Sequence, residues 1–205
     1  MLCLVVALGA ACDSGDGREL REPTEGQRAA MTTSTSTTST LPGAISDTGV
    51  TLTAAPAAAF TLQAPWPDGG VIDVRFTCDG ENRSPALSWS TPPPSTVELA
   101  LLVTDDDAGD FVHWAVAAIP PTVSEVGEGA QITGALEGVT DFNTPGWGGP
   151  CPPSPGETHT YRFTLYALGQ QTELPNDFTG DELAELAAST AIALAEVTGT
   201  YTRAG

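Results

Sequence analysis

The chain has 205 residues, which allows one domain with extensions or two small domains. It carries 26 acidic and 7 basic residues, so its formal net charge at pH 7 is −19. A negative field of this size disfavours binding to nucleic acid and to anionic lipid surfaces, and we therefore expect no nucleic-acid partner.

Residues 1–12, MLCLVVALGAAC, form a short apolar run that ends in small residues and a cysteine. About ten apolar residues are too few to span a bilayer as a helix, and the pattern is typical of a secretory signal segment. The ending GAAC resembles a bacterial lipobox, although Gly9 stands where an aliphatic residue is expected. The segment predicts lipid attachment at Cys12. The alternative, a buried first helix, is less favoured because the residues that follow could not cover it.

Residues 13–57 are rich in Thr, Ser, Gly and charge and almost lack large apolar side chains. Such a segment cannot bury enough surface to offset its conformational entropy, so we expect a disordered linker. With Cys12 lipidated, the linker would hold a domain outside the cytoplasm, on the membrane of a bacterium.

Residues 58–205 have the composition of a folded domain, with 20 acidic residues against four arginines. Short stretches rich in β-branched and aromatic residues alternate with Gly and Pro clusters, as in all-β domains. Helical spacing occurs only in DELAELAASTAIALAE from Asp181, the expected N-cap, with Leu183, Leu186, Ala187, Ile192 and Leu194 on its buried face. The pattern predicts an antiparallel β-sandwich with a C-terminal helix. The expected strands are 60–63, 71–77, 86–90, 97–104, 111–119, 161–168 and 196–202.

Two cysteines, Cys78 and Cys151, lie within this domain. In an exported protein such a pair most often forms a disulfide, although two buried thiols remain an alternative. A zinc site is disfavoured because no CxxC spacing is present.

Four stretches of the domain occur in the order and spacing of a known family. Together they resemble the phosphatidylethanolamine-binding proteins, most closely the bacterial Raf kinase inhibitor-like branch. The resemblance covers nearly all of residues 58–205 and implies a large antiparallel sheet packed on a second sheet, with a small anion-binding cavity at one end. The four stretches are FTCDGENRSPALSW (76–89), TDDDAGDFVHW (104–114), DFNTPGWGGPCPP (141–153) and HTYRFTLYAL (159–168).

The resemblance implies a set of ligand-binding residues. Two acidic positions of the family's first motif are matched here, and so is the histidine that follows them. The second motif is matched in its Gly-Pro loop and at both ends of its His-Arg-Tyr triplet, whose arginine is replaced by Thr160. Loss of that arginine shifts anion binding to the histidines and backbone amides. The implied ligand residues are Asp105, Asp107, His113, Gly149, Pro150, Pro152, His159 and Tyr161, with Trp147 at the rim.

The residues themselves support a similar interpretation. A glycine-rich loop can offer backbone N–H groups to an anion, and a carboxylate beside an imidazole favours its protonated form. On an extended chain, Asp105 and Asp107 would share the cavity side, while Asp106 points away and is dispensable. Histidines that only satisfy core hydrogen bonds are the alternative.

Metal and hydrolytic chemistry have weaker support. A calcium loop starting at Asp105 would require glutamate at its twelfth position, where Val116 stands. A zinc site built from both histidines and a carboxylate has no local spacing in its favour. No GxSxG or HExxH motif is present. We therefore expect a membrane-tethered domain that binds a small anion or phospholipid headgroup, not an enzyme, without cofactor or metal. The alternative is an interaction module that inhibits an extracytoplasmic enzyme.

Overall fold

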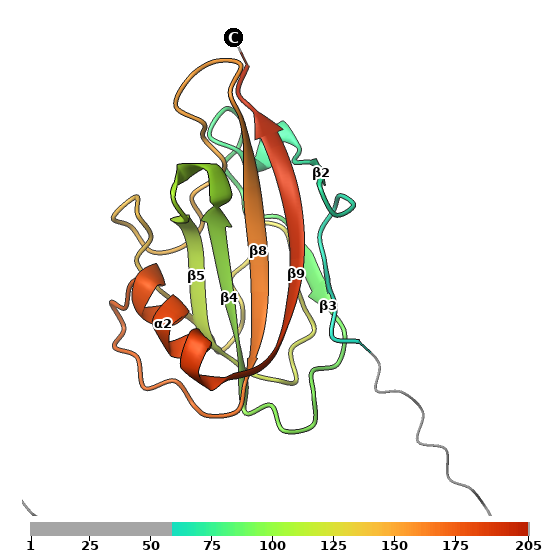
Figure 1. The fold of residues 1–205 in the computed structure, drawn as a ribbon, viewed down its shortest axis with the longest axis vertical. Helices are drawn as coiled ribbons and strands as arrows, with labels where there is room; N and C mark the ends of the chain where they lie inside the picture. The colour runs from blue at the N-terminus through green and yellow to red at the C-terminus, as the bar shows by residue number, and fades with distance from the viewer. Residues whose placement is uncertain (1–58, 205) are drawn as a thin grey trace, which may run out of the picture. The chain divides into compact units, whose positions relative to one another are not determined.

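In the computed structural model, which describes residues 59–204, two β-sheets pack face to face and one helix covers the outer face of the larger sheet (Figure 1). The six-stranded sheet has the order β2 (Gly70–Val71), β9 (Ala191–Thr202), β8 (Thr158–Leu168), β4 (Glu98–Asp105), β5 (Phe111–Ile119) and β7 (Leu136–Glu137). The small sheet has the order β1 (Leu62–Gln63), β3 (Leu87–Trp89) and β6 (Glu125–Val126). All pairings are antiparallel except β2 with β9. The predicted fold class is confirmed.

The central strands are buried on both faces, which explains their nearly continuous apolar sequence. In β4, Leu99, Leu101 and Val103 face the small sheet and belong to the main core. The alternate residues Ala100 and Leu102 face helix α2 (Gly180–Thr190) and belong to a second core. Two cores therefore hold the large sheet between the small sheet and the helix.

The register of the long strands brings distant residues to one end of the sheet. β4 pairs with β8 from Glu98 opposite Leu168 to Asp105 opposite Tyr161. A short 3₁₀ turn, Asp106–Ala108, then connects β4 to β5, and the first residue of β5, Phe111, pairs back with Asp105. The end of β4, the start of β5 and the start of β8 therefore lie side by side, at the top of Figure 1.

Helix α2 is shorter than the sequence predicted. Its N-cap is Thr179, not Asp181, and Thr179 forms a capping box with Glu182. The helix ends at Thr190, so the apolar residues after it lie on β9. Ile192 and Leu194 are 47% and 52% exposed, and assigning them to a buried helix face was wrong. Among residues 59–204 no helix is long and apolar enough to cross a membrane.

Another predicted strand, 71–77, is mostly a turn. β2 covers only Gly70–Val71, and a 3₁₀ helix follows at Val74–Phe76 because Asp73 caps it by accepting a hydrogen bond from the Arg75 N–H. Of the remaining predicted strands, 111–119 has the predicted bounds as β5, and the others have shifted ends, the largest change being the extension of the last one back to Ala191. β6 and β7, of two residues each, were not predicted.

The end of α2 can be tested with two leucine truncations. Leu183 lies on the buried face of α2 and is fully buried, so Leu183→Ala should lower the free energy of unfolding by about 2–5 kcal/mol. Leu194→Ala should change it by less than about 0.5 kcal/mol, because half of that side chain is already in solvent. Urea unfolding measures both. Similar losses for the two variants would show that Leu194 is buried and would contradict this boundary.

Candidate functional site

Asp105, the last residue of β4, is the centre of a polar cluster at the end of the sheet. Its side chain is only 5% exposed. Oδ1 accepts a hydrogen bond from the Asp107 N–H at 3.0 Å, which caps the 3₁₀ turn. Oδ2 lies 2.7 Å from His159 Nδ1 and 3.9 Å from His113 Nε2. One buried carboxylate thus lies between the only two histidines of the chain.

His159 lies near the start of β8, two residues before Tyr161, which pairs with Asp105. Because a carboxylate can only accept, His159 Nδ1 must carry the proton of the 2.7 Å hydrogen bond. Nε2 does not take part in this bond. It lies 3.9 Å from Glu157 Oε2, and the His159 side chain is 13% exposed. Asp105 therefore orients His159 more directly than His113, the partner expected from the sequence.

His113, on β5, is fixed by the loop that follows residue 145. Its Nδ1 donates to the Gly148 carbonyl at 2.7 Å, and the Gly148 N–H donates back to the His113 carbonyl at 2.8 Å. The ring is 3% exposed, and this burial is the main reason that the pKa of His113 is lowered, against the opposing effects of Gly148 and Asp105. At neutral pH the ring is therefore uncharged, with the lone pair of Nε2 on the side of Asp105.

Tyr161 packs against both imidazoles. Its ring meets His113 edge to face at 5.1 Å and stacks near His159 at 6.5 Å between centroids. Tyr161 is fully buried, yet its hydroxyl has no hydrogen-bond partner among the described residues. Burial and the nearby Asp105 charge raise its pKa, so the phenol keeps its proton. A buried hydroxyl without a partner is costly and marks a place where a ligand or water could bind.

Two phenylalanines cover the outer side of His113. Phe111 lies 5.3 Å and Phe142 lies 5.2 Å from its ring centroid, and the two phenyl rings meet at 4.9 Å. Phe142 is 41% exposed, so one of its faces meets solvent. The sequence analysis did not identify this aromatic cover.

The glycines of the GWGGPCPP loop have a packing role. A side chain at Gly148 would collide with the Phe142 ring, and one at Gly149 would collide with the Phe76 carbonyl. The Gly149 N–H donates to Asn82 Oδ1 at 2.7 Å, while the Gly148 N–H is bound to His113. The amide of Gly149, an implied ligand residue, therefore has a partner within the domain, and so does that of Gly148.

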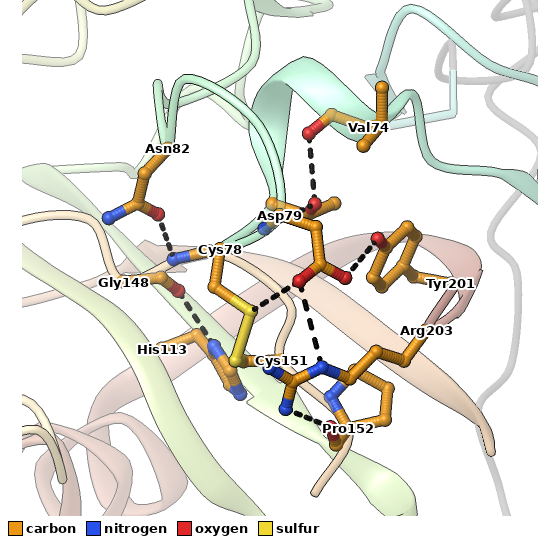
Figure 2. The surroundings of a disulfide bond; sticks show 12 residues. Val74, Cys78, Asp79, Asn82, His113, Gly148, Cys151, Pro152, Tyr201 and Arg203 are labelled. Atoms are coloured by element: carbon orange, nitrogen blue, oxygen red, sulfur yellow. Dashed lines mark hydrogen bonds and ion pairs between the residues drawn. A yellow bond between two sulfur atoms is a disulfide. The ribbon is translucent and has the colours of Figure 1, made fainter. Parts of the chain in front are cut away.

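A disulfide holds this loop in place (Figure 2). Cys78 and Cys151 are bonded, with Cα atoms 5.5 Å apart, as predicted. Beside the bond, the Cys78 N–H donates to the Pro150 carbonyl at 3.1 Å, and Arg203 donates to the Pro152 carbonyl at 3.0 Å. Pro150 and Pro152 thus contribute loop carbonyls that tie Cys151 to two other segments.

Asp79 joins the disulfide to the end of β9. Its carboxylate accepts a hydrogen bond from the Tyr201 hydroxyl at 2.7 Å and lies 3.6 Å from Arg203 Nε (Figure 2). Arg203 lies two residues after Tyr201, and Tyr201 pairs with His159 between β9 and β8. Arg203 was not predicted from the sequence.

The three aspartates after β4 have separate roles. Asp107 Oδ2 accepts a hydrogen bond from the Thr160 N–H at 2.7 Å and so joins the turn to β8. Asp106 points away, as predicted, but binds the Arg162 guanidinium through both oxygens, at 2.6 and 3.2 Å. The chain is a 3₁₀ turn here and not extended, and Asp106 has a partner, contrary to its interpretation as dispensable.

Trp147 lies on the inner side of the loop. Its ring stacks near Phe163 and meets Trp114 edge to face, and its Nε1–H donates to the Phe76 carbonyl at 3.1 Å. It also lines a separate cavity of about 230 Å³ with Asn82 and Arg83. Trp147 therefore anchors the loop in the core rather than standing at an exposed rim.

Among residues 59–204 no three His, Cys, Asp or Glu side chains are placed to hold one ion. In the cluster itself, His159 Nδ1 and Asp105 Oδ2 are joined by a hydrogen bond of 2.7 Å.

Asn82 is the main residue of this region that the sequence analysis missed. It has a left-handed backbone, φ 53°, and its side chain binds the Gly149 N–H. The sequence GEN at 80–82 indicated a turn, which suits asparagine at positive φ, but the distant bond could not be inferred from it.

Fold and site together define a class of protein: a two-sheet β domain with a buried His-Asp-His cluster at one end of its large sheet. The family model described as phosphatidylethanolamine-binding protein matches residues 63–202. The chain belongs to this family.

Individual relatives agree with this assignment. The Mycobacterium tuberculosis protein named "Putative lipoprotein LppC" is 37% identical over 98% of this chain and 92% of its own length. The Escherichia coli protein YbcL, whose crystal structure is described as a member of the mammalian PEBP family, superposes with a TM-score of 0.64 at 31% identity, covering 70% of this chain and 98% of its own. A Chlamydia trachomatis homologue, CT736, has a TM-score of 0.65 at 33% identity over 71% of this chain and 98% of its own.

The contribution of the disulfide can be measured directly. Because the bond closes a loop of 73 residues, Cys78→Ser/Cys151→Ser should lower the free energy of unfolding by about 4 kcal/mol in urea. A reducing agent should destabilise the wild type by a similar amount and leave the double variant unchanged. Equal stability of the oxidised wild type and the double variant would contradict the prediction.

Proposed function

We propose that the domain binds a small anion, such as a phosphate-bearing headgroup or a carboxylate, at the His113, His159 and Tyr161 cluster, and that it acts as a binding protein and not as an enzyme. The observation that carries the proposal is that three polar groups without partners lie on rings that pack together, Tyr161 between His113 and His159. Neither Nε2 atom nor the Tyr161 hydroxyl has a hydrogen-bond partner among the described residues. Each can donate to an anion, the imidazoles when protonated.

The fixed tautomers define how each histidine would act. In both rings Nδ1 is occupied, by Gly148 or Asp105, so only Nε2 is available to a ligand. Asp105 holds His159 in place and its negative charge compensates a proton gained by either ring. The aromatic cover of Phe111 and Phe142 limits access of water to His113, which strengthens hydrogen bonds formed there.

Neighbouring carboxylates limit the affinity for anions at neutral pH. Glu157 lies 3.9 Å from His159 Nε2, and Asp105 lies beneath both rings. Because burial lowers the pKa of His113, this ring gains its proton only below its usual value of 6.5, and binding should strengthen as the pH falls.

Histidine-selective NMR with inorganic phosphate and with phosphorylethanolamine tests the proposal. Millimolar ligand should shift the ring signals of both histidines, with affinity several-fold higher at pH 5.5 than at pH 7.5. His159→Gln, which also assigns the signals, should weaken binding about tenfold, whereas Asp106→Asn on the opposite side of the turn should not. A response to phosphorylethanolamine alone would identify a headgroup rather than a free anion.

Silence of both rings at millimolar concentrations of either ligand would exclude the proposed site. Binding that is unchanged in His159→Gln would place the anion elsewhere on the domain. A rise in affinity with pH would contradict the role given to the protonated rings.

The proposal also includes a membrane tether through a lipid on Cys12. Cys12 lies outside the described residues, so support comes from the GAAC ending and from the relative named as a lipoprotein. When the full chain is expressed in a mycobacterial host, wild type should enter the detergent phase on phase partition and Cys12→Ala the aqueous phase. Equal partition of the two would contradict lipidation at this position.

A further inference from the structure

Part of the large sheet has an unpaired edge. β2 covers only the upper end of β9, where Gly70 pairs with Gly199 and Val71 with Thr200 (Figure 1). Below it no other described strand of this sheet lies beside β9 on that side. The segment Ala191–Val197 is therefore bonded to β8 on one side only.

At the end of β9 that pairs with β2, the hydrogen bonds show which backbone groups of β9 point outward. The Thr200 carbonyl accepts a hydrogen bond from the Ile72 N–H at 2.8 Å, and the Thr198 carbonyl accepts from the Gly69 N–H at 3.1 Å. Successive residues of a strand direct their N–H and C=O groups to opposite sides. The N–H and C=O of Leu194 and Glu196 therefore also point outward. No described residue bonds to these four groups.

The same segment exposes apolar side chains. Ile192 and Leu194 are 47% and 52% exposed, although they are among the large apolar residues of the chain. Leu194 pairs across the sheet with Tyr166, which is half-buried. Exposed apolar residues on an unpaired strand are usually avoided in monomeric proteins, because they promote pairing with another chain.

A groove continues from this edge toward the covered end. It has a volume of about 420 Å³, and its lining includes Pro65, Trp66, Pro67, Asp68, Glu196 and Val197. Both charged residues in this set are acidic, but Glu196 already lies 3.7 Å from Arg162 Nη1, whereas Asp68 has no ion pair among the described residues. Asp68 Oδ1 accepts hydrogen bonds from the backbone and side chain of Thr198, so the carboxylate is held at the border of the edge.

We propose that the Ala191–Val197 edge of β9 binds an extended segment of another protein as an added strand, with apolar residues against Leu194 and a lysine or arginine near Asp68. The outward N–H and C=O groups call for a polypeptide backbone as partner. The acidic lining selects a basic end for that segment. This surface is separate from the histidine cluster, and its occupation does not depend on anion binding.

A labelled peptide provides the test with the full-length protein. The probe is a fluorescein nonapeptide that begins with two lysines and continues with alternating valine and threonine, which favour the extended form. Its control has two central valines replaced by proline and loses backbone donors. Fluorescence anisotropy should show saturable binding of the probe and at least tenfold weaker binding of the control.

Matched lysine substitutions locate the binding edge. Leu194→Lys should weaken binding at least tenfold, because lysine protects a strand edge and repels the basic probe. Val71→Lys adds the same charge at a residue that is 75% exposed on β2, and it should change the affinity less than twofold. Asp68→Asn should weaken binding several-fold at low salt and less at high salt.

Hydrogen exchange gives a readout that does not depend on the folding of a variant. In the wild type, the amides of Leu194 and Glu196 should exchange rapidly and become protected when the probe is added. Protection before addition would show that the chain's own residues 1–58 cover the edge and would overturn the proposal. Equal binding of probe and control, no binding at 1 mM, or a dimer abolished by Leu194→Lys would also overturn it, the last in favour of a second copy.

Discussion

The pairing of β4 with β8 is the constraint on which the site depends. It sets Asp105 opposite Tyr161 and therefore beside His159, two residues earlier on β8. A shift by one residue would turn every side chain of β4 to the other face, moving Leu99, Leu101 and Val103 out of the main core. The hydrophobic register that stabilises the domain is thus the same register that assembles the polar cluster. Mutations in the core of β4 should consequently affect site geometry as well as stability.

The second constraint is the clamped loop that carries the Gly148 carbonyl. His113 depends on that carbonyl for its tautomer, and the loop in turn depends on Asn82 and on the bond between Cys78 and Cys151. None of these partners lies on a strand of the large sheet. One histidine is therefore fixed by a strand neighbour and the other by a disulfide-bonded loop, so the two can respond differently to reduction of the disulfide.

The sequence was most informative where one residue type has few possible roles. Two domain cysteines predicted their bond, and short stretches rich in β-branched and aromatic residues predicted β4, β5 and β8. It failed where tertiary contacts decide between alternatives. AIALAE continues a helical pattern, but its place beside β8 makes it a strand, and Thr179 rather than Asp181 caps the helix because it alone forms the reciprocal bonds with Glu182. Likewise, the sequence could not reveal that the Phe142 ring requires a glycine at 148 and that the Phe76 carbonyl requires one at 149.

The proposed anion site would lie in a domain that offers few free cations. The four domain arginines are engaged with carboxylates: Arg75 and Arg83 with Glu128, Arg162 with Asp106, and Arg203 with Asp79. A ligand at the cluster therefore meets neutral or protonated donors rather than a fixed positive charge. Neutral donors bind weakly in water but more strongly where burial excludes it, and both rings and Tyr161 are largely buried. At the proposed site, selectivity would come from the protonation state of the ligand. A singly protonated phosphate can donate to the lone pair of a neutral imidazole Nε2 while accepting from the Tyr161 hydroxyl, whereas a fully ionised phosphate can only accept.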